Sequence, residues 1–97
     1  MRGPATIKPA SKVVNVSYDP EVDAAAIDFT ASHASVRTVH VDDARHFDED
    51  ADGQVTCIEL LDVSKGVRLD GLPEQELVRQ ALQDIADRQG WATAPIR

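Results

Sequence analysis

Residues 48–59, DEDADGQVTCIE, have the acid spacing of a calcium-binding loop. Aspartates occupy the first, third and fifth positions, glycine the sixth and glutamate the twelfth. In an EF-hand these positions give carboxylate oxygens to Ca²⁺, the glycine makes the sharp turn, and the seventh residue gives its backbone carbonyl. One hypothesis is therefore a calcium-binding module with the ligands Asp48, Asp50, Asp52, Gln54 and Glu59.

The same stretch also has the sequence of a β-hairpin. Asp52-Gly53 is a turn signal, and strand-forming residues follow it over 54–61. An EF-hand loop needs an entering helix, but the residues at 36–41 alternate as in a strand, and Gly66 interrupts the exit segment after about two turns. The hairpin is the preferred interpretation, and it places Glu59 in mid-strand, too far along to close on the tip. A weak cation site made by the three aspartates alone stays open as a minor alternative.

The net charge of −7 is concentrated in one segment. Residues 42–62 contain eight acids and one base, while the nine acids and nine bases elsewhere cancel. Phosphate backbones are repelled by such a surface, so direct nucleic-acid binding is not expected. A cation or a small basic protein fits better as a partner, and the residues predicted to interact with a basic protein are Asp42, Asp43, Asp48, Glu49, Asp50 and Asp52. An orphan structural domain, whose acidic face only confers solubility, is a further alternative.

The histidines His33, His40 and His46 form no standard zinc motif, and the single cysteine, Cys57, cannot complete one. On one strand, His40 and His46 would share a face only if the chain ran straight through 42–45, which is not expected, so the preferred interpretation is exposed histidines of a hairpin. Cys57 lies in an apolar pattern and is expected to be a small buried residue. No nucleophile elbow or glycine-rich phosphate loop is present. The sequence therefore predicts no enzyme, no catalytic residues and no cofactor, calcium belonging only to the alternative above.

Hydrophobic periodicity predicts an α+β fold, an antiparallel β-meander of four to five strands followed by one C-terminal amphipathic helix. The expected strands are 13–18, 24–30, 36–41 and 54–61, with 45–47 as a short additional one. The pattern predicts shared faces for three groups: Val14, Val16 and Tyr18; Ala25, Ile27 and Phe29; and Val55, Cys57 and Leu61. Ile58 and Leu60 make the other face of the last strand apolar too, as in a central strand.

One helix is predicted after residue 72. Pro73 suits its first position, and Gly90 suits its C-terminal stop. The domain organisation is a flexible N-terminal tail at 1–12, a single domain at 13–91 and a C-terminal tail at 92–97, with Trp91 packing back on the sheet or on a partner. No secretory signal and no membrane span are recognised, so a cytoplasmic location is expected. Homodimerisation is expected because so small a domain buries a limited share of its surface.

The motifs YDPEVDAAAIDF (18–29) and DGQVTCIELLDVS (52–64) resemble an uncharacterised bacterial family of small β-rich domains of unknown function. Ala26 and Cys57 depart from the family pattern, which usually has an aromatic residue and a glycine at these positions. The family offers no catalytic residues to transfer. Some members look like partners of small toxin-like proteins encoded beside them, so the resemblance implies an antitoxin-like role.

Overall fold

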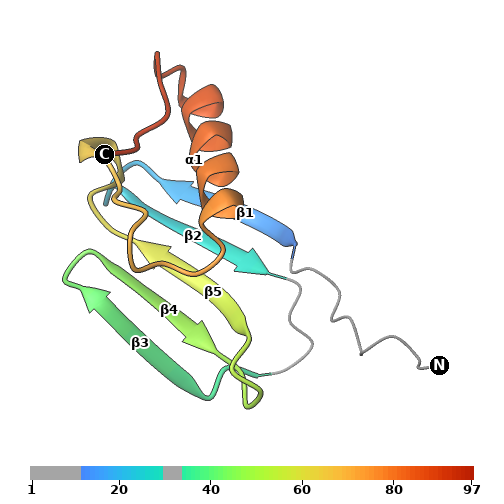
Figure 1. The fold of residues 1–97 in the computed structure, drawn as a ribbon. Coiled ribbons are helices and arrows are strands. Elements are labelled where there is room, and N and C mark those ends of the chain that lie inside the picture. The colour runs from blue at the N-terminus through green and yellow to red at the C-terminus, as the bar shows by residue number, and fades with distance from the viewer. Residues whose placement is uncertain (1–11, 30–33) are drawn as a thin grey trace.

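The computed structural model describes residues 12–29 and 34–97 (Figure 1). Its elements in chain order are β1 (Val13–Asp19), β2 (Ala24–Phe29), β3 (Arg37–Asp42), β4 (Arg45–Glu49), β5 (Val55–Leu60), the short 3₁₀ helix η1 (Val63–Lys65) and α1 (Gln75–Gln89). The predicted α+β fold with a C-terminal helix is confirmed.

The five strands form one antiparallel sheet in the order β1-β2-β5-β4-β3. The hairpin β1–β2 joins the meander β3–β4–β5 because β5 returns to pair with β2. β5 is therefore the central strand, which agrees with its apolar sequence. β1 and β3 are the two edge strands of the sheet.

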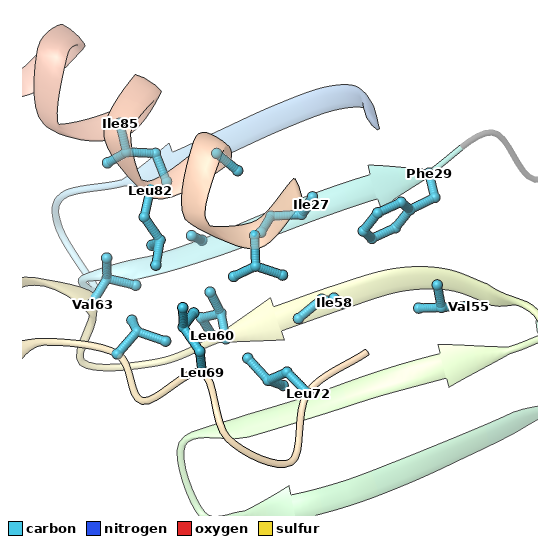
Figure 2. Packing of buried hydrophobic residues seen from close by; sticks show 14 residues of the cluster. Ile27, Phe29, Val55, Ile58, Leu60, Val63, Leu69, Leu72, Leu82 and Ile85 are labelled. Atoms are coloured by element: carbon cyan, nitrogen blue, oxygen red, sulfur yellow. The ribbon is translucent and has the colours of Figure 1, made fainter. Parts of the chain in front are cut away.

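The hydrophobic core lies on one face of the sheet, under α1 and the segment that precedes it (Figures 1 and 2). Ala25, Ile27 and Phe29 of β2 share this face as predicted, and all three are buried. Ile58 and Leu60 extend the face on β5, and Val78, Leu82 and Ile85 of α1 pack onto it. Each fully buried aliphatic side chain contributes roughly 2 kcal/mol, so this single layer of contacts dominates the stability of the fold.

β-Bulges change the predicted alternation in β1 and β5. The pairing of β1 with β2 shifts between Val13 and Asn15, so Val14 is 58% exposed while Val13 packs against the core beside Val16 and Tyr18. A second shift, opposite Asp48 and Glu49, turns Val55 towards the core. The predicted sharing of a face by Val14 with Val16, and by Val55 with Cys57, is thus wrong, because a bulge inserts one residue and inverts the parity.

The helix begins later than the sequence suggests. Pro73 precedes the helix, Glu74 is its N-cap with a left-handed φ of 53°, and Gln75 is its first residue. The predicted stop is right: Gly90 has φ 75°, and its N–H donates to the carbonyls of Ala86 and Asp87. A glycine tolerates this conformation without steric cost.

Residues 1–11, nearly all of the predicted N-terminal tail, lie outside the described residues. At the other end, the Val67 N–H donates to the Pro95 carbonyl over 2.7 Å, and the Arg97 N–H donates to the Val67 carbonyl over 2.9 Å. Trp91 packs back on the sheet, with its ring 5.4 Å from that of Tyr18 in an edge-to-face arrangement. The segment after the helix is therefore held against the body of the domain.

Candidate functional site

The face of the sheet opposite the core, here called the open face, is the candidate site. Strand register assigns to it one continuous set of positions across all five strands, because directly paired residues share a face. The set is Asn15, Ser17, Asp19, Ala24, Ala26, Asp28, Thr38, His40, His46, Asp48, Cys57 and Glu59. None of these residues is buried, whereas the opposite face holds the core.

The open face is acidic. It carries the carboxylates of Asp19, Asp28, Asp48 and Glu59, and none of its positions is lysine or arginine. The Thr38 hydroxyl donates to Asp48 Oδ1 over 2.7 Å, and His46 Nε2 lies 2.9 Å from Glu59 Oε1. These cross-strand contacts fix two of the carboxylates on the surface. Ala24 and Ala26 contribute only small side chains to the part of the face that β2 forms.

Cys57 lies on the central strand of this face, paired with Asp28 on one side and Asp48 on the other. Burial raises the pKa of its thiol, and a hydrogen bond to Asp28 and the charges of Asp28, Glu59 and Asp48 raise it further, to about 12. The negative charge of the carboxylates repels a thiolate, and the same charge attracts a cation. Cys57 is half-buried, whereas the sequence predicts a buried residue, and its raised pKa disfavours the thiolate.

The six acids predicted as interaction residues do not form one surface. Asp42 and Asp43 lie at the β3–β4 turn, whereas Glu49, Asp50 and Asp52 lie at the other end of β4, and only Asp48 belongs to the open face. Asp42 is engaged by Arg45, whose hydrogen bonds lower the pKa of the Asp42 carboxyl. Glu49 pairs with Arg37 at 2.7 Å. The acidity of the segment 42–62 is therefore divided among three places, which its sequence alone does not reveal.

Residues 48–59 belong to a β-hairpin. Its first residues end β4 and its last form β5, so the flanking helices of an EF-hand are replaced by strands. Asp50 is 2% exposed, and its Oδ1 accepts the N–H groups of Asp52 and Gln54 over 2.9 and 3.0 Å. This carboxylate closes the loop itself. Glu59 lies in mid-strand beside His46, as the hairpin interpretation predicts.

Within residues 12–29 and 34–97, no three side chains of His, Cys, Asp or Glu come together to hold a metal ion. The four acids of the calcium hypothesis, Asp48, Asp50, Asp52 and Glu59, form no such group either.

His40 and His46 are direct cross-strand partners, with ring centroids 5.5 Å apart. The two histidines belong to a hairpin, as predicted, and they share a face because the chain reverses at Asp43 and Ala44 and pairs β3 with β4. His33 lies outside the described residues. Together, His40, His46 and Glu59 form a polar row across the open face.

The residues that carry the family resemblance have a structural role. Tyr18 donates its hydroxyl proton to Asp23 Oδ1 over 2.7 Å, and Ser64 donates its N–H and its hydroxyl to the two oxygens of Asp23, over 2.9 and 2.7 Å. Asp23 has a left-handed φ of 55° in the β1–β2 turn. We call these three residues the Asp23 bracket; it ties the first hairpin to η1.

A comparison with family models finds one match, described as "Protein of unknown function (DUF2283)", over residues 15–64. The chain belongs to this family. The predicted resemblance to a small domain family of unknown function is thereby confirmed, and no curated protein and no solved structure matches the chain. The DUF2283 region contains almost the whole sheet and ends at Ser64, so the Asp23 bracket joins its first turn to its last residue.

The helix α1 lies outside the DUF2283 region but completes its core. Leu82 and Ile85 are fully buried against strands that belong to the matched region. The helix α1 packs on the core face, and the residues of the open face of the DUF2283 domain are exposed or half-buried. No helix within the described residues is long and apolar enough to cross a membrane.

Proposed function

We propose that this DUF2283 domain is a small protein-interaction module that binds a basic protein partner on its open face. The observation that carries the proposal is the asymmetry of the sheet: one face is closed by α1, and the other presents four carboxylates and no lysine or arginine. An acidic and preformed surface attracts cations and needs little reorganisation on binding. Neutralisation of a small basic toxin-like protein is one specific form of this role.

Burial is the largest cause of the raised pKa of Cys57, and the nearby carboxylates of Asp28, Glu59 and Asp48 add to it. Asp28, Glu59 and Asp48 converge on this thiol from three adjacent strands, so their fields add at one point of the surface. A lysine or arginine side chain placed over Cys57 would lie close to all three carboxylates. Such a contact is stronger than one with an isolated surface carboxylate, because several charges act together.

The test compares two triple variants that each remove three negative charges. The first, Asp28→Asn, Asp48→Asn and Glu59→Gln, neutralises the open face. The control, Asp43→Asn, Asp52→Asn and Glu76→Gln, removes the same charge from the two turns and from α1. Binding of a fluorescent lysine decapeptide is measured by anisotropy at ~0.1 M salt, where charges more than about 10 Å apart are largely screened.

We expect the open-face variant to lose at least about tenfold in affinity and the control to lose less than about threefold. Equal losses in both variants would show that only net charge matters and would refute a specific open-face site. Larger loss in the control would move the site to the hairpin turns. Failure of the unmodified protein to bind the peptide would overturn the proposal itself.

A further inference from the structure

We infer that two copies of this chain pair through their β3 strands, in an antiparallel register centred near Val39, to form one continuous sheet. β3 is one of the two edges of the sheet, and no other element lies beside its outer side in Figure 1. An edge strand presents unpaired backbone N–H and C=O groups and is a template for another strand. Over the described residues, no side chain bonds to the backbone of Arg37, Thr38, Val39 or His40.

The other edge, β1, is protected. Arg88 of α1 reaches over it and donates from Nη1 to the Val16 carbonyl over 2.9 Å, while Asp84 holds the same guanidinium at 2.8 Å. The bulge after Val13 further breaks the regularity of this strand. A charged side chain and a bulge are two of the devices by which proteins block edge pairing. The bulge of β3 lies only at its end, after His40, so the run from Arg37 to His40 is regular.

Charge complementarity selects a second copy of the same chain as the partner of β3. The strand begins with Arg37 and ends in the turn that carries Asp42 and Asp43. An antiparallel pair of such strands brings the arginine end of each copy beside the acidic turn of the other. The register with Val39 at the centre also places two half-buried valines together and keeps the core faces of both copies on the same side.

The interface is small, since each copy contributes a six-residue strand. Edge pairing of this size falls in the class of weak interfaces, so dimerisation is expected in the range of roughly 10 to 500 µM. The inference does not depend on the basic partner: the open faces of both copies would remain free and would become coplanar.

The test is a charge exchange followed by sedimentation velocity. Arg37→Glu places acid against acid in both symmetric contacts, and Asp43→Arg places base against base; both side chains are exposed. Arg79→Glu on α1 is the matched control, because Arg79 is likewise exposed and lies 3.6 Å from a glutamate of its own chain. Circular dichroism checks that each variant is folded.

We expect the unmodified chain and Arg79→Glu to dimerise. Arg37→Glu alone and Asp43→Arg alone should each raise the protein concentration at the midpoint of dimerisation by at least about tenfold. An equimolar mixture of Arg37→Glu with Asp43→Arg should recover the dimer, because both contacts then join opposite charges. A monomer throughout this range, a dimer insensitive to both substitutions, or a mixture that stays monomeric would each overturn the inference.

Discussion

Replacement of Asp23 should separate the side-chain and backbone contributions of the Asp23 bracket. Its carboxylate accepts three hydrogen bonds, one from Tyr18 and two from Ser64, all between 2.7 and 2.9 Å. Because the site is half-buried, we assign these bonds together about 2 kcal/mol rather than the full value for charged hydrogen bonds. Alanine at a left-handed φ of 55° adds about 1 kcal/mol of strain.

Three variants then form a series in the free energy of unfolding. Asp23→Ala should lose about 3 kcal/mol, and Asp23→Gly about 2 kcal/mol because glycine relieves the strain. Asp23→Asn should lose about 1 kcal/mol, because it keeps the shape and tolerates the left-handed region but loses the charge. Denaturant unfolding monitored by the fluorescence of Trp91 gives the values. Asp19→Asn, the same charge change at an exposed residue of the same turn, should stay within about 0.5 kcal/mol.

The pH dependence gives an independent check. Burial raises the pKa of Asp23, but the hydrogen bonds from Tyr18 and Ser64 outweigh it and lower the pKa below its ordinary 3.8. A carboxyl with a lowered folded-state pKa stabilises the fold above its unfolded pKa, and this stability is lost as the pH falls through the folded value. The difference in stability between the unmodified protein and Asp23→Asn should thus be full at neutral pH and shrink below about pH 4.

Tyr18 offers a direct spectroscopic test because it is the only tyrosine. Burial raises the pKa of its phenol, and the hydrogen bond to Asp23 and the charges of Asp23 and Asp19 raise it further, to about 12. Near-ultraviolet titration of the phenolate should show this value and a decrease in Asp23→Asn. Because the folded state raises this pKa, protonated Tyr18 stabilises the fold below about pH 10, and this contribution is lost as the pH rises through 12. A Tyr18 that titrates near 10 in the unmodified protein would refute the bracket.

Three further predictions concern other parts of the molecule. Arg45→Ala should lower the free energy of unfolding by denaturant by about 3 kcal/mol, because the buried guanidinium donates to Asp42 and to the carbonyls of Arg68 and Asp70. Arg45→Lys should recover only part of the lost stability, and a loss below about 0.5 kcal/mol in Arg45→Ala would contradict the prediction. Calcium at ~1 mM should leave the melting temperature unchanged, because Asp50 already accepts two backbone N–H groups; stabilisation abolished by Glu59→Ala would restore the EF-hand hypothesis. Cys57 should react slowly with iodoacetamide at pH 8, and the open-face triple variant should react faster, whereas equal rates would remove the evidence for converging carboxylates.

Local patterns in the sequence predict the elements of this fold better than they predict its surfaces. Alternation in 24–29 places Ala25, Ile27 and Phe29 in the core, because a regular strand has a period of two. The same reasoning fails for Val14, since a bulge depends on the partner strand and leaves no local signal. The hairpin at 48–59 is recognised because its flanking residues are strand-like, whereas the spacing of the acids within the stretch, taken alone, favours a calcium-binding loop.

The candidate site is harder to predict because it depends on pairing between distant strands. The sequence places Asp28 on the face of its strand opposite Ala25, Ile27 and Phe29, but it indicates two apolar faces for the strand of Glu59, and only the pairing of β2 with β5 makes Asp28 and Glu59 neighbours. The acidic run 42–62 draws attention to the turns, where arginines or backbone N–H groups already engage Asp42, Glu49 and Asp50. Asp48 and Glu59 of the open face also have side-chain partners, Thr38 and His46, but neither partner is an arginine or a lysine. The density of acids along the chain is therefore a poor guide here, and the register of the sheet, which brings three carboxylates around Cys57, is the better one.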